Sequence, residues 1–173
     1  MNSEFAILPL AGSPKVISAL ADLLVEAVAN GGSVSFMHPL AHDTANHFWE
    51  SSLAAAARGE RVVLGAWEGD LLVGTLTLLL KCPPNQPHRA EIAKMITRVS
   101  HRNRGVARAL MEEAERVAGE RGRTLLTLDT AEEDGAAGLY EKLGFQRTGV
   151  IPGYALKPHG GLTGTIIYWK RID

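Results

Sequence analysis

Between residues 92 and 129 the hydrophobic period of the sequence changes twice, and this change restricts the fold more than any other feature. An apolar, strand-like run over residues 92–99 is followed by a turn that contains Gly105. Apolar residues then recur at helical spacing over residues 106–118, and a second short apolar run covers residues 124–129. A strand, a helix and a strand in this order form a crossover, which pairs the two strands in parallel.

The remaining patterns add mostly antiparallel strands to this unit. Ser13 and Pro14 are typical of a helix N-cap and first helical position, and Asp43 or Thr44 is expected to cap a second helix. Glu68-Gly69-Asp70 predicts a tight hairpin turn. The predicted strands are residues 5–10, 61–67, 71–81, 89–99, 124–129, 146–150 and 164–170; the predicted helices run from 14 to about 30, from 43 or 44 to about 59, over 106–118 and over 134–143, and residues 151–162 are predicted to be a loop.

This order of elements predicts an α+β fold, in the sense of three α/β layers, with a mixed, mostly antiparallel central sheet and helices on both faces. The length of 173 residues is most simply one domain, spanning residues 1–173. Strict alternation in the strand over residues 89–99 places Glu91, Ala93, Met95 and Thr97 on one face and Ile92, Lys94, Ile96 and Arg98 on the other.

Charge and composition limit the classes of partner and the cellular location that are expected. With 18 Lys and Arg against 19 Asp and Glu, the chain has a formal net charge of −1, so no bulk attraction to nucleic acid or to an anionic membrane is expected. A single cysteine, Cys82, excludes an internal disulfide and favours a reducing compartment. We see neither a signal peptide nor an apolar run long enough to span a membrane, so a cytoplasmic location is expected.

The segment Arg102-Asn103-Arg104-Gly105-Val106-Ala107, with Arg108 behind it, has the features of a diphosphate-binding site. A helix start leaves backbone N–H groups without partners and carries a partial positive charge. Glycine and alanine let a phosphate approach that backbone closely. A charge run is more often a solvated surface, but these charges coincide with a helix start and small residues. The segment matches neither the Rossmann glycine pattern nor a P-loop.

Three further residues are candidates for proton transfer. Asp129 ends the strand after the crossover helix, where ligands of such sheets gather, and it could take a proton from a substrate ammonium; an Asp that caps the next turn is the plainer interpretation. Glu91 in the neighbouring strand is either a second base or a solvent-facing partner of a lysine. Tyr140 is either a packed core residue or a proton donor to a leaving thiolate, because a phenol is protonated at neutral pH.

Other chemistries find no support in the sequence. The six histidines show no metal-ligand spacing with an acid or a cysteine, so no metal site is expected. A serine-hydrolase elbow of the form Gly-x-Ser-x-Gly is absent. Cys82 precedes two prolines in a predicted loop and has no signature of a nucleophile.

With these residues in view, the chain resembles the GNAT acetyltransferase superfamily. Residues 102–107 match its Arg/Gln-x-x-Gly-x-Gly/Ala motif for acetyl-CoA, and Tyr140, Gly144 and Phe145 match its Tyr-x-x-x-Gly-Phe segment. A closer resemblance, to tabtoxin-resistance-type acetyltransferases, covers most of the chain and includes residues 31–37, 89–91, 126–130 and 152–154.

The resemblance implies a role for each candidate residue. The backbone of Met95, Ile96 and Thr97 would hold the pantetheine arm of acetyl-CoA, and the amides from Asn103 to Arg108 would hold its diphosphate. Glu91 and Asp129 would activate the amine, and Tyr140 would act as the general acid. The cofactor-binding residues implied are Met95, Ile96, Thr97, Arg102, Asn103, Arg104, Gly105, Val106, Ala107 and Arg108.

The expected function is therefore an acetyl-CoA-dependent N-acetyltransferase that acts directly on a primary amine of a small molecule, such as an amino-acid-like compound, a toxin or an antibiotic. A protein or peptide N-terminal acetyltransferase is an alternative, favoured by an open groove around Phe36 and Tyr154, whereas a closed pocket favours a small molecule. A non-catalytic acyl-CoA sensor is a second alternative. The sequence leaves homodimer formation open, although strand edges of such sheets often pair.

Overall fold

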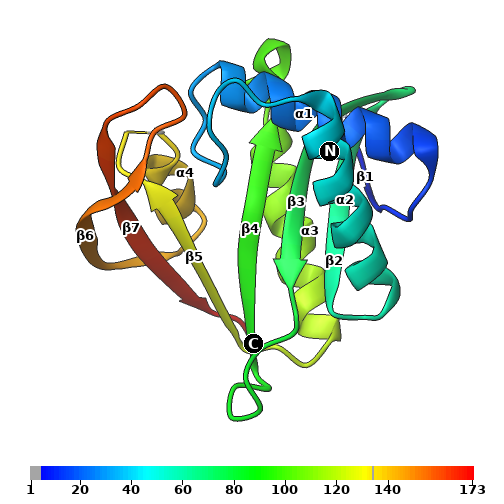
Figure 1. Cartoon of the computed structure of the whole chain (residues 1–173). Coiled ribbons are helices and arrows are strands. Elements are labelled where there is room, and N and C mark those ends of the chain that lie inside the picture. Colours follow the sequence, from blue (N-terminus) through cyan, green and yellow to red (C-terminus); the bar gives the residue numbers. More distant parts are fainter. Residues whose placement is uncertain (1–4, 134) are drawn as a thin grey trace.

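Seven strands form one sheet in the order β1-β2-β3-β4-β5-β7-β6 (Figure 1). The computed structural model describes residues 5–133 and 135–173. Every strand pair is antiparallel except β4 with β5, which are joined through α3 as the crossover predicts. The predicted fold class is thus confirmed. The strands are β1 (Ala6–Pro9), β2 (Arg61–Glu68), β3 (Leu71–Leu79), β4 (Arg89–Thr97), β5 (Leu125–Ala131), β6 (Gln146–Leu156) and β7 (Leu162–Arg171).

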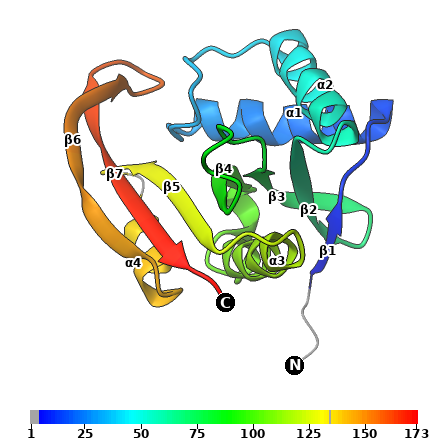
Figure 2. The same ribbon diagram turned by 90° about the horizontal axis from the view of Figure 1, so that it is seen from below.

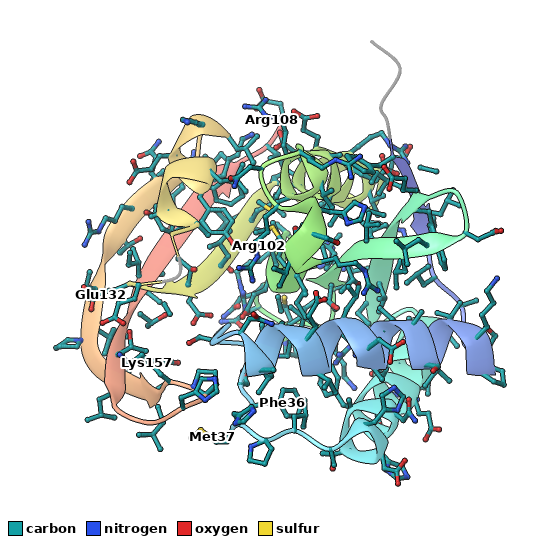
Figure 3. The ribbon with its side chains drawn as sticks, turned by 90° about the horizontal axis from the view of Figure 1, so that it is seen from above. Phe36, Met37, Arg102, Arg108, Glu132 and Lys157 are labelled. Atoms are coloured by element: carbon teal, nitrogen blue, oxygen red, sulfur yellow. The ribbon has the colours of Figure 1, made fainter. Side chains whose placement is uncertain are left out.

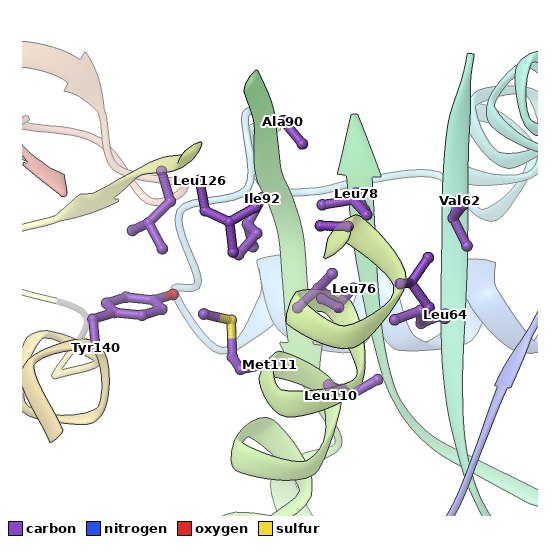
Figure 4. Packing of buried hydrophobic residues seen from close by; sticks show 14 of the residues in the cluster. Val62, Leu64, Leu76, Leu78, Ala90, Ile92, Leu110, Met111, Leu126 and Tyr140 are labelled. Carbon is purple, nitrogen blue, oxygen red and sulfur yellow. The ribbon is translucent and has the colours of Figure 1, made fainter. Parts of the chain in front are cut away.

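Helices cover both faces of the sheet (Figure 2). The first face carries α1 (Pro14–Ala29), whose N-cap Ser13 accepts a hydrogen bond from the Val16 N–H as expected, and α2 (His42–Ala57). The second face carries α3 (Val106–Glu120) and the short α4 (Ala137–Lys142). Two separate hydrophobic clusters result, one on each face, and Figure 4 shows side chains of the cluster under α3. None of the helices in the described residues is long and apolar enough to cross a bilayer.

The two parallel strands separate soon after they pair. Only residues 89–91 of β4 are paired with residues 125–127 of β5, and beyond them the strands diverge (Figure 1). Because β4 continues to Thr97, its edge on the β5 side has no strand partner over residues 92–97. Backbone N–H and C=O groups on an unpaired edge remain available to a ligand.

A β-bulge interrupts β4 at the same place. Thr75 and Thr77 of β3 pair with Ile96 and Ala93, so β4 has one residue more than its partner, and Lys94 has a φ of 50°. The predicted strict alternation is therefore wrong for this strand, because an extra residue reverses the faces beyond it. Ile92 packs in the cluster under α3, whereas Ile96 packs in the cluster under α1 and α2.

Several predicted boundaries need correction. The predicted loop over residues 151–162 is mostly strand, because β6 and β7 form a long hairpin whose turn spans only residues 157–161. The second helix begins at His42 after Ala41, so neither Asp43 nor Thr44 is its N-cap. Strand β4 ends at Thr97 before a 3₁₀ turn (Val99–His101), and β5 continues past Asp129 to Ala131. The fourth helix begins at Ala137; Asp134, where it was predicted to start, lies outside the described residues.

The start of α3 is positioned by its tight packing on β3. A Cβ atom at Gly74 would lie 2.6 Å from Val106 Cγ1 and 3.1 Å from both Ile96 O and Leu110 Cδ1. We expect Gly74→Ala to lower the free energy of unfolding by about 1–3 kcal/mol, the usual cost of overpacking a core. Chemical denaturation measures this loss. In contrast, Gly119→Ala inside α3 meets no atom within 4 Å, and we expect it to be neutral or stabilising.

Candidate functional site

A cleft of about 970 Å³ opens where β4 and β5 diverge. Its walls are the free edge of β4, the start of α3, the middle of β5, the segment before and within α4, and the loop between α1 and α2. Figure 3 shows Arg108 toward one end of the molecule in this view, Arg102 near the middle, and Phe36, Met37 and Lys157 toward the other end. The predicted residues that line the cleft are Met95, Ile96, Thr97, Arg102, Asn103, Gly105, Val106, Ala107, Arg108, Asp129 and Tyr140.

At the α3 end the cleft is built to accept an anion. Gly105 is the N-cap residue of α3 with a φ of 86°, a conformation that favours glycine, and a Cβ there would meet open space. The first intrahelical bond runs from the Ala109 N–H to the Gly105 carbonyl, so the three amides before Ala109 have no partner within the helix. No side chain among the described residues caps this end of α3. These features fit a diphosphate group.

The free edge of β4 can accept an extended chain that is attached to this diphosphate. Met95, Ile96 and Thr97 line the cleft, and they belong to the stretch of β4 that has no partner on the β5 side. An extended amide-containing chain can therefore add to this edge by main-chain hydrogen bonds, much as an added strand does. The site thus offers binding positions for a diphosphate and for the arm that follows it.

Arg104 does not line the cleft, unlike Arg102 and Arg108. Its guanidinium donates to Glu68 Oε1 at 2.5 Å and lies 5.5 Å from the ring centroid of Phe5. The same carboxylate accepts from His101 Nε2 at 2.9 Å. These hydrogen bonds from His101 and Arg104 lower the pKa of Glu68, which keeps the carboxylate ionised. Glu68, at the end of β2, therefore anchors the segment that leads into α3.

We predict that this anchor supports binding at the α3 end. Glu68→Gln should raise the Kd for CoA about two- to fivefold and leave kcat at saturation unchanged, because a solvent-exposed ion pair contributes little free energy. Calorimetric titration of the variant and the wild type gives the comparison. An unchanged Kd would show that the segment holds its conformation without Glu68.

Two candidate proton-transfer residues reach the cleft from opposite faces of the sheet. Asp129 is exposed, and its Oδ2 accepts a hydrogen bond from Thr165 Oγ1 at 3.0 Å. Tyr140 is 5% exposed and belongs to the cluster under α3 with Leu126 and Leu128, and Figure 4 shows Tyr140 and Leu126 among the side chains of this cluster. Since Leu128 and Asp129 are successive strand residues, their side chains point to opposite faces. A ligand group between β4 and β5 is therefore within the part of the cleft that Asp129 lines from one face and Tyr140 from the other.

Glu91 is placed differently from these two. It lies on β4 where β4 and β5 are still paired, and it is not among the residues that line the cleft. Its Oε2 accepts a hydrogen bond from Arg89 Nη1 at 3.3 Å, and the same Arg89 nitrogen donates to Thr127 Oγ1 at 3.0 Å. The structure thus gives Glu91 a side-chain partner and places Asp129 nearer to the open part of the cleft.

Two segments far apart in sequence meet beyond Ser35, the last residue of the α1–α2 loop that lines the cleft. The His38 N–H donates to the Pro158 carbonyl at 2.9 Å, and His159 Nε2 contacts the Ala29 carbonyl at 3.0 Å. The two imidazole rings stack with centroids 4.4 Å apart. The loop between α1 and α2 is thereby joined to the tip of the β6–β7 hairpin. Sequence reasoning missed this bridge, because a contact between residues so distant leaves no local pattern.

Sequence reasoning also passed over Lys94, which lines the cleft at the bulge of β4. Its Nζ donates to Ser35 Oγ at 3.2 Å and lies 5.7 Å from the ring centroid of Phe48. Burial lowers the pKa of Lys94, while the charges of Asp129 and Glu91 raise it. A lysine inside an otherwise apolar strand run is the signal that could have identified it.

Comparison with known proteins identifies a family and several curated relatives. Residues 22–145 match the family described as the acetyltransferase (GNAT) family. A curated relative, N-acetyltransferase 8F1 of Rattus norvegicus, is 33% identical over 86 residues, which cover 49% of this chain and 39% of the relative. The probable N-acetyltransferase family 8 member 5 of Mus musculus is 35% identical over 86 residues, covering 49% and 38%. The matches therefore span about 40% of the length of these relatives.

Solved structures share the fold over nearly the whole chain. An N-acetyltransferase from Staphylococcus aureus Mu50 has a TM-score of 0.80 at 17% identity, covering 97% of this chain and 99% of that one. An acetyltransferase from Salmonella typhimurium with acetyl-CoA has a TM-score of 0.78 at 17% identity, covering 97% and 95%. An aminoglycoside 6'-N-acetyltransferase complexed with coenzyme A has a TM-score of 0.74 at 18% identity, covering 97% of each chain.

Proposed function

Because this chain belongs to the acetyltransferase (GNAT) family, we propose that it transfers the acetyl group of acetyl-CoA to the primary amine of a small molecule. The cleft supports the proposal by its length and order. An anion site at the start of α3 is followed by a free strand edge, and then by a pair of proton-transfer residues. A nucleotide diphosphate, its pantetheine arm and a reactive thioester come in this same order. The chain supplies no metal-binding group among its described residues, and this chemistry requires none.

The positions of Asp129 and Tyr140 in the cleft support the roles that we propose for them. Asp129 takes the proton from the acceptor ammonium, directly or through a water molecule, so that a neutral amine can attack the thioester carbonyl carbon. The new C–N bond forms as the C–S bond breaks. The Tyr140 hydroxyl gives its proton to the departing sulfur and regains one, through water, as the acylated nitrogen loses its second proton. The proton held by Asp129 returns to solvent. Each of the two residues thus moves one proton, which is the usual task of a positioned acid or base.

The contact between the α1–α2 loop and the β6–β7 hairpin is our reason for proposing a small acceptor and not a peptide. An open groove around Phe36 and Tyr154 would admit an extended peptide. Instead, the His38 N–H donates to the Pro158 carbonyl at 2.9 Å, which joins the α1–α2 loop to the tip of the β6–β7 hairpin. This connection, two residues from Phe36, supports a compact acceptor over a polypeptide segment that must pass this point.

The acceptor that we propose is an amino-acid-like compound or a related toxin or antibiotic. Support comes from the resemblance of residues 31–37 to tabtoxin-resistance-type acetyltransferases. Ser35 of this segment and Asp129 both line the cleft. Gly31 to Ser35 lie between α1 and the bridge, on the wall that an acceptor would meet.

The test is an acetyl-transfer assay with acetyl-CoA and a panel of amines. We expect thiol release that depends on a small amine, together with an acetylated product that mass spectrometry detects. Preferential acetylation of peptide N-termini would favour a peptide acetyltransferase instead. CoA binding without thiol release for any amine or peptide would favour an acyl-CoA sensor and would contradict the proposal.

A further inference from the structure

Lys94 places a positive charge in the part of the cleft next to Asp129. Lys94 lies at the bulge of β4 and has a φ of 50°. Its side chain therefore does not follow the alternation of faces along the strand. The Nζ atom is held by two contacts, a 3.2 Å hydrogen bond to Ser35 Oγ and the Phe48 ring at 5.7 Å. Both contacts come from the α1–α2 side of the sheet, which is also the side that Asp129 faces.

This charge is not neutralised by an ion pair. No carboxylate among residues 5–133 and 135–173 lies within ion-pair distance of Lys94 Nζ, although Asp129 and Glu91 are near enough to influence it. Arg61, on the same side, adds a further positive charge and lowers the pKa of Lys94 along with its burial. A half-buried ammonium without a carboxylate partner costs solvation energy that an anionic ligand group would recover.

We propose that Lys94 binds the carboxylate of the acceptor, so that the preferred acceptors are amino acids whose amine lies close to a carboxylate. The inference rests on the proposed function and specifies its substrate class. An α- or β-amino acid presents an ammonium and a carboxylate a few bonds apart, which matches Asp129 of β5 and Lys94 of β4 as a pair of opposite charges that line the same cleft. Ser35 contributes a second donor, because its Oγ accepts from Lys94 and keeps its own proton to give to the carboxylate.

The competing interpretation is that Lys94 only stabilises the wall. Its contacts with Ser35 and Phe48 would then hold the α1–α2 loop in place, and its loss would affect every acceptor equally. A carboxylate-binding role affects only acceptors that carry a carboxylate. The two interpretations are therefore separated by paired substrates and not by the loss of activity alone.

The experiment compares free amino acids with the carboxamides of the same amino acids as acceptors. For the wild type we expect a kcat/KM that is about tenfold or more higher for the acid than for the amide, as a hydrogen-bonded charge pair provides. Lys94→Ala should remove this preference, because it raises KM for the acid much more than KM for the amide. Lys94→Arg should retain much of the preference because it keeps the charge.

Lys81→Ala is the matched control, since it removes one lysine that is 73% exposed and paired with Glu60 outside the cleft. It should leave the preference intact. Equal kcat/KM for acid and amide in the wild type, or an equal loss for both in Lys94→Ala, would overturn the role of Lys94 while the proposed function stands. No transfer to any amine would overturn the proposed function itself and the inference with it.

Discussion

Tyr140→Phe is expected to lower kcat about 10²- to 10⁴-fold, the contribution of a positioned general acid. The substitution removes one oxygen from a side chain that is 5% exposed and packs against Phe145 and Tyr168, so the ring contacts remain. The departing thiolate must then take its proton from water. The KM for acetyl-CoA should change little, because Tyr140 lies beyond the diphosphate end of the cleft. Steady-state kinetics with saturating amine measures both values.

Tyr168→Phe provides the matched control for this variant. Tyr168 is also buried, its ring centroid is 5.7 Å from that of Tyr140, and its hydroxyl donates to Glu141 Oε1 at 3.2 Å. Loss of that hydroxyl should cost some stability and little activity. If Tyr140→Phe retains wild-type turnover, Tyr140 is a packing residue and the proposed acid lies elsewhere.

Asp129→Asn is the second variant with a large expected effect, again about 10²- to 10⁴-fold on kcat. The side-chain carbonyl of Asn can still accept the hydrogen bond from Thr165 Oγ1, so the fold at β5 and β7 should be preserved. What is lost is the ability to accept the ammonium proton. The remaining activity should therefore rise with pH toward the pKa of the free amine, a profile that the wild type should not show.

Glu91→Gln tests which of two carboxylates, Glu91 or Asp129, is the base, since the sequence left both as candidates. Glu91 is bonded to Arg89 and does not line the cleft, so we expect a smaller effect than for Asp129→Asn. Asp70→Asn, in the turn between β2 and β3, should have no effect on rate. A larger loss for Glu91→Gln than for Asp129→Asn would reverse the assignment of the base.

The parts of the fold that could be predicted are those written in short stretches of sequence. The change of period around Gly105 predicts the strand, turn and helix that the structure contains, and Ser13 caps α1 as its position indicates. The same local pattern identifies residues 102–108 as a binding segment. All of them except Arg104 line the cleft. Backbone conformation and capping depend on near neighbours, so a single sequence carries this information.

The features that escaped prediction depend on partners distant in sequence. The bulge at Lys94 is set by pairing with β3, and it moves Ile96 to the opposite core from the one that alternation predicts. The contact of His38 with Pro158 joins two segments that share no pattern. The Arg104 side chain turns to Glu68, which the charge run alone could not show. The residues at the end of the cleft that we assign to the acceptor therefore come from the structure, whereas those that we assign to the diphosphate could be predicted from the sequence.

The central claim is that the backbone amides at the start of α3 bind the diphosphate of CoA. Calorimetric titration of the folded protein with CoA and, separately, with pantetheine tests it most directly, because pantetheine keeps the arm and lacks the diphosphate. We predict that CoA binds with one site per chain and pantetheine about a hundredfold more weakly, since several charge-assisted hydrogen bonds are lost. Equal affinities for the two, or no heat from CoA, would contradict the account.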